Sequence, residues 1–77
     1  MPQPVSKSQE KQLKKLGMKF KAIRKEKGLT LEEVAIKIGK DRQSIHKLEK
    51  GSFNPSYLYL LEVTKGLGIA IEDLLKE

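Results

Sequence analysis

Apolar residues between Leu31 and Leu48 are spaced for two short helices that meet at Gly39. Residues at helical intervals occur on both sides of the glycine, and they are Val34, Ala35, Ile38, Ile45 and Leu48. Every residue between Gly39 and Ile45 is polar. The pattern therefore restricts this segment to two amphipathic helices joined by a tight turn, and the second helix directs a polar face outward.

Capping residues support the same two helices. Thr30 and Glu33 form a T-x-x-E capping box, which predicts that the first helix begins at Leu31. Gly39 follows the last apolar residue, where a sharp helix end favours a left-handed conformation without a Cβ. Asp41 is a suitable N-cap for the second helix. The segment is therefore a helix-turn-helix.

The whole chain is predicted to be all-α, with five helices in one domain. Residues 1–7 contain two prolines and polar neighbours, so we expect a disordered tail followed by a domain over residues 8–77. Apolar periodicity predicts a long first helix, a fourth helix and a short last helix outside the central motif, over residues 8–27, 56–66 and 69–75. Gly17 lowers the intrinsic helix propensity in the middle of the first of these.

Composition narrows the class of protein further. The chain has 77 residues, a formal charge of +6 and no cysteine, so it is one small domain without disulfides or cysteine-based zinc sites. His46 is the only histidine, and no catalytic triad, phosphate loop or metal-ligand cluster has workable spacing. No apolar run approaches the length of a membrane span. We therefore expect a cytoplasmic protein that is not an enzyme, has no cofactor or metal, and does not bind membranes.

Basic residues concentrate in two places. Residues 1–30 carry nine Lys and Arg against two Glu, and further basic residues surround the turn and the second helix of the motif, namely Lys37, Lys40, Arg42, Lys47 and Lys50. A basic face on a folded helix indicates that the protein binds a polyanion, and the helix-turn-helix motif favours duplex DNA as that polyanion. For the first helix, a merely solvated lysine-rich surface is an equal alternative.

From Leu16 to Leu75 the chain resembles the lambda-repressor-like, or XRE, helix-turn-helix family. The resemblance rests on FKAIRKEKGLTLEEVAIKIGKDRQSIHKLEKG, then NPS, then LLEVTKGLGIAIEDLL. It implies a five-helix bundle that inserts its third helix into the major groove of double-stranded DNA, usually as a homodimer on a palindromic operator.

Residue roles follow from this resemblance position by position. The base-reading positions fall on Arg42, Gln43, Ser44 and Lys47; Arg and Lys can donate to guanine, and Gln can pair with adenine. Contacts with the DNA backbone are expected from Thr30, Lys40, Lys50, Ser52 and Asn54. His46 can reach a base or a phosphate, or be an exposed residue without a role.

The family pattern also implies a partly buried ion pair between Arg24 and Glu49, as opposed to two independent surface charges. Two residues depart from the pattern. Leu31 replaces a glutamine that many relatives use to contact a phosphate, and Phe53 occupies a loop position that is commonly basic. Phe53 therefore needs a burial partner, in this chain or in another protein.

A dimer interface is expected on the last two helices. The fourth helix is predicted to turn Tyr57, Leu60, Leu61 and Thr64 inward and Tyr59 outward, which leaves a possible outer apolar patch of Leu58, Val63, Ile71 and Leu75. The alternative is a set of scattered surface apolar residues.

Two functions remain from the sequence. The first is a sequence-specific DNA-binding transcriptional regulator, such as a repressor or a controller protein. The second is a protein-interaction module, such as an antitoxin that binds a protein partner and uses DNA only to control its own operon.

Overall fold

A computed structural model describes residues 6–76 of the chain, which form five α-helices. The helices are α1 (Lys7–Glu26), α2 (Leu31–Ile38), α3 (Arg42–Lys50), α4 (Tyr57–Leu67) and α5 (Ile71–Leu75). The all-α prediction is confirmed. The first helix begins one residue earlier than expected because Ser6 caps it, accepting a hydrogen bond from the amide of Gln9. Of the tail expected to be disordered over residues 1–7, Ser6 and Lys7 belong to the start of this helix, and residues 1–5 lie outside the described residues.

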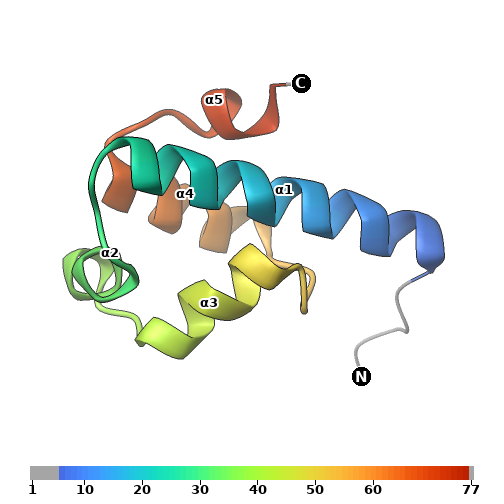
Figure 1. Cartoon of the computed structure of the whole chain (residues 1–77), viewed down its shortest axis with the longest axis horizontal. Helices are drawn as coiled ribbons and strands as arrows, with labels where there is room; N and C mark the ends of the chain where they lie inside the picture. Colours follow the sequence, from blue (N-terminus) through green and yellow to red (C-terminus); the bar gives the residue numbers. More distant parts are fainter. Residues whose placement is uncertain (1–5, 77) are drawn as a thin grey trace.

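Helix α1 runs across the middle of the view in Figure 1, with α5 above it and α3 below it. Helix α3 packs against one side of α1, and α5 packs against another side. Helix α2 bridges α3 and α4, and α4 also contacts α5. The two helices of the central motif therefore rest on a scaffold built by α1 and α4.

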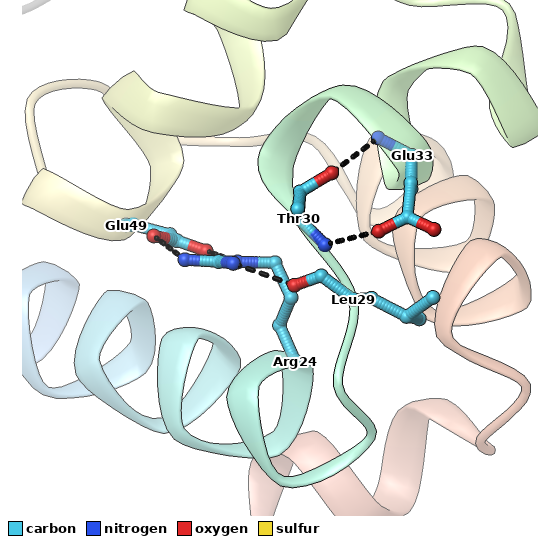
Figure 2. Close-up of polar contacts among 5 residues, drawn as sticks. All are labelled: Arg24, Leu29, Thr30, Glu33 and Glu49. Carbon is cyan, nitrogen blue, oxygen red and sulfur yellow. Dashed lines mark hydrogen bonds and ion pairs between the residues drawn. The ribbon is translucent and has the colours of Figure 1, made fainter.

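The ends of α2 are set by the residues that the sequence indicates. The Thr30 hydroxyl accepts from the amide of Glu33, and the Glu33 carboxylate accepts from the amide of Thr30 at 2.9 Å (Figure 2). These hydrogen bonds lower the pKa of Glu33. Gly39 ends the helix at φ 67°, and Asp41 then accepts from the amide of Ser44 to begin α3. The predicted caps and the predicted turn are confirmed.

The core is built from all five helices. Its buried apolar residues are Phe20, Val34, Ala35, Ile45, Leu48, Leu60, Val63, Leu67, Ile71 and Leu74. No helix within residues 6–76 is long and apolar enough to cross a membrane.

Two residues of the predicted dimer patch belong to this core. Val63 is 0% exposed and Ile71 is 8% exposed, so their assignment to an outer patch is wrong. The physical reason is that the buried stripe of α4 follows the i, i+3, i+4, i+7 pattern from Leu60 and includes Val63. Tyr57, predicted to face inward, is exposed, and Tyr59, predicted to face outward, is half-buried.

Helix α3 approaches the backbone of α1 very closely at its carboxyl-terminal end. A Cβ built on Gly17 would collide with the carbonyl oxygens of Leu48 and Glu49. A Cβ built on Gly51, just after α3, would lie 2.7 Å from the backbone nitrogen of Lys14. Gly51 also has φ 70°, which a side chain disfavours. These two glycines let the backbones of α1 and the α3 turn touch.

Gly17→Ala should therefore destabilise the protein although alanine is the better helix former. We expect a loss of about 1–3 kcal/mol in the free energy of unfolding, because the new methyl group meets rigid backbone. Urea denaturation followed by circular dichroism measures it. Met18→Ala is the matched control, since Met18 is exposed on the same turn. Equal stabilities of the two variants would contradict the close approach.

Candidate nucleic-acid interface

One face of α3 carries polar and basic side chains into solvent. Its exposed residues are Arg42, Gln43, His46, Lys47 and Lys50. Arg42, His46 and Lys50 recur every four residues, and Gln43 and Lys47 lie next to them, so all five share one face of the helix. This face lies opposite the buried Ile45 and Leu48. The structure therefore brings together three of the four residues predicted to read bases.

Ser44 has a different environment. Its hydroxyl lies 2.6 Å from the hydroxyl of Tyr59 on α4 and is part-buried. Tyr59 in turn stacks edge to face with Phe53, with 5.3 Å between the ring centroids. Burial raises the pKa of Tyr59, and the hydrogen bond from Ser44 offsets part of this rise. Ser44 thus connects α3 to α4, and its predicted role as a base reader stays a prediction.

Lys40 also turns toward α4. Its Nζ lies 2.9 Å from the Glu62 carboxylate and 4.8 Å from the ring centroid of Tyr59, and its side chain is only 23% exposed. The expected contact between Lys40 and DNA stays a prediction. Lys40 lies directly after Gly39, so these interactions fix the turn of the motif to the scaffold.

Arg24 of α1 and Glu49 of α3 form a buried bidentate ion pair (Figure 2). The Arg24 Nε donates to one carboxylate oxygen at 2.6 Å, and its Nη2 donates to the other at 3.1 Å. Nη1 donates at 2.7 Å to the carbonyl oxygen of Leu29. Arg24 therefore holds three segments together: α1, the end of α3 and the loop that precedes α2.

The expected backbone-binding residues lie on both flanks of the exposed α3 face. Thr30 is exposed at the start of α2, and its hydroxyl proton stays available because the oxygen acts as acceptor in the capping box. On the other flank, Lys50 and Asn54 are exposed. The Ser52 hydroxyl donates at 3.3 Å to the carbonyl oxygen of Lys47, so Ser52 also caps α3.

The two carboxylates nearest to α3 in the sequence have structural roles. Asp41 caps the helix and Glu49 pairs with Arg24. Within the part of the chain that the structure describes, no cluster of three His, Cys, Asp or Glu residues could hold a metal ion. The exposed face is thus positively charged, and hydrogen-bond donors dominate its chemistry.

Comparison with known proteins shows the family to which this chain belongs. The helix-turn-helix family model matches residues 20–74. The chain belongs to the helix-turn-helix family. An uncharacterized HTH-type transcriptional regulator, y4dJ of Sinorhizobium fredii, is 39% identical over 61 residues, 79% of this chain and 79% of the relative. The control protein C.MunI of a Mycoplasma species is 36% identical over 64 residues, 82% of this chain and 86% of that protein.

Solved structures of helix-turn-helix proteins share the fold. The restriction-modification controller protein C.AhdI from Aeromonas hydrophila superimposes with a TM-score of 0.80 at 31% identity, covering 83% of this chain and 97% of that chain. The clp gene regulator ClgR from Corynebacterium glutamicum gives a TM-score of 0.77 at 31% identity, covering 80% of each chain. The lambda-repressor-like fold expected from the sequence is confirmed.

Sequence reasoning did not identify the cluster of Lys40, Tyr59 and Glu62 that connects this helix-turn-helix to α4. The available signal was Phe53, whose need for a burial partner is met by Tyr59. Helical periodicity alone placed Tyr59 outward, because periodicity carries no information about contacts between a helix and a loop.

Glu49→Ala should destabilise the protein by about 3–5 kcal/mol, because it leaves the buried Arg24 guanidinium without its partner. Thermal or urea denaturation measures this loss. The double variant Arg24→Met/Glu49→Leu removes both charges and should recover most of the stability. If Glu49→Ala unfolds like the wild type, the pair has no structural role.

Proposed function

We propose that this helix-turn-helix transcriptional regulator recognises a palindromic operator in double-stranded DNA as a homodimer. In this proposal, α3 enters the major groove, where Arg42, Gln43 and Lys47 contact base edges. Residues on the flanks, including Thr30, His46, Lys50 and Asn54, contact phosphates and set the orientation of the helix. We place its action in the cytoplasm, where such an operator is accessible.

The single observation that carries the proposal is the composition of the exposed α3 face. Five neighbouring side chains on it are basic or polar, and the carboxylates of Asp41 and Glu49, next to α3 and within it, are engaged as a cap and in an ion pair. The face offers donors to guanine and to phosphates, and the exposed carboxylates of Glu32 and Glu10 lie only at its edges, beside Arg42 and Lys50. The names of the related regulators and controller proteins support the same function.

Dimerisation is supported by the two members of the expected apolar patch that stay exposed. Leu58 on α4 is 69% exposed, and Leu75 on α5 is 55% exposed. A homodimer would place two copies of α3 about 34–36 Å apart, so that they reach successive major grooves on one side of the duplex. The antitoxin alternative receives no support from the relatives described above.

Selection of bound duplexes from a random pool tests the proposal directly. We expect enrichment of one inverted-repeat sequence, with half-site centres about one helical turn apart. Absence of any enriched sequence would overturn the proposal of sequence-specific regulation.

Arg42→Ala and Lys50→Ala should affect binding in different ways. Loss of the Arg42 contact should cost about 1–3 kcal/mol on the selected operator and relax the preference at one base pair. Loss of Lys50 should weaken binding to all sequences by similar factors and reduce the salt dependence. Titrations of matched and single-substituted duplexes at two salt concentrations measure both effects. Identical profiles for the two variants would contradict the division between base and phosphate contacts.

Leu58→Lys and Leu75→Lys should shift the protein toward monomer, because each places a charge in an apolar contact. Sedimentation velocity over a range of concentrations measures the shift. Ile36→Lys is the control, since Ile36 is exposed to a similar degree but lies on α2. If all three variants sediment like the wild type, α4 and α5 do not form the interface.

A further inference from the structure

The amino-terminal half of α1 extends beyond the part of the chain that defines the family. The family model begins at residue 20, whereas α1 begins at Lys7. Residues 7–19, which we call the extension, carry five lysines against one carboxylate, namely Lys7, Lys11, Lys14, Lys15 and Lys19 against Glu10. Its function is therefore not explained by the motif alone.

The structure fixes the position of this extension relative to α3. Gly51 directly follows α3, and its missing side chain lets the turn contact the backbone of Leu13 and Lys14. Figure 1 shows the first turns of α1 continuing past this end of α3, on the side of the loop to α4. The extension thus lies beside the flank where Lys50 and Asn54 are exposed.

Shared surface depressions connect the extension to these residues. One depression is lined by Glu10, Lys14 and Lys50, together with Leu13, Gly51 and Ser52. A neighbouring one is lined by Gln9, Gln12, Leu13 and Asn54. The polar surface that begins on α3 therefore continues without interruption onto α1.

Helical geometry aligns the two outermost lysines of this surface. Lys7 and Lys14 are seven residues apart, which is about two turns, so they share a face and lie about 10.5 Å apart along the axis. Both side chains are exposed. Glu10 lies between them and is the one opposing charge on this face.

We propose that the extension of α1 is an additional DNA-binding surface, in which Lys7 and Lys14 contact phosphates of the duplex flanking the operator. This inference rests on the proposed function, because it requires α3 to lie in the major groove. It enlarges the footprint of the protein on one flank of each half-site without adding any base contact.

The test compares two double variants with the same loss of charge. Lys7→Gln/Lys14→Gln removes the proposed contacts. Lys65→Gln/Lys76→Gln removes two charges from the ends of α4 and α5, and α5 lies across α1 from α3. Both variants have a formal charge two units lower than the wild type. Net charge alone should therefore change the DNA affinity of the two variants equally.

Affinity for the selected operator is measured as a function of salt concentration. Removing two phosphate contacts should reduce the slope of log K against log salt by about 1.8. Between 50 and 200 mM salt, the wild type should then lose about tenfold more affinity than Lys7→Gln/Lys14→Gln. The base preference should stay unchanged, and Lys7→Arg/Lys14→Arg should retain the wild-type slope. A slope that falls equally in the control variant, or not at all, overturns the inference.

A second measurement uses the unmodified protein and shortens the DNA. Removal of base pairs from the operator flanks should weaken binding of the wild type and leave binding of Lys7→Gln/Lys14→Gln nearly unchanged. Equal dependence on flank length in both proteins would mean that these lysines are only a solvated surface. That result leaves the proposed function standing, whereas failure of the wild type to select any operator overturns the function itself.

Discussion

The close approach of α1 and the carboxyl-terminal end of α3 is the constraint on which the rest of the structure depends. Gly17 and Gly51 allow the two backbones to touch, and the ion pair between Arg24 and Glu49 closes the same contact on a buried side. Because Arg24 also holds the carbonyl of Leu29, the start of α2 is positioned by the same guanidinium. The orientation of both helices of the motif thus follows from one junction with α1.

The distribution of charge around α3 follows from the same packing. Glu49 and Asp41 would repel a phosphate if they were free, but Glu49 is neutralised by Arg24 and Asp41 accepts a hydrogen bond from the amide of Ser44. Lys40, in contrast, is withdrawn from the surface by Glu62 and Tyr59. The positive charge that remains exposed near the motif is therefore concentrated on the outward face of α3 and on the neighbouring turns of α1.

Local signals in the sequence predicted the parts of the fold that local chemistry determines. The capping box at Thr30, the turn at Gly39 and the N-cap at Asp41 each depend on residues within a few positions of one another. The role of Gly17 could not be predicted from local signals, because this glycine is required by a close contact with Leu48 and Glu49, which are distant in the sequence. Similarly, Tyr59 and Val63 were assigned outward because periodicity does not show which other segment covers a residue.

Chain order gives the position of α1 a consequence for folding during synthesis. Of the five helices, α1 leaves the ribosome first and α5 last, and α1 packs against α3 and α5. Helices α2 and α4, in contrast, pack against near neighbours in the sequence. Until α3 has emerged, α1 lacks the helix against which it packs most extensively. The element that organises the finished protein is thus among the last to be fully enclosed.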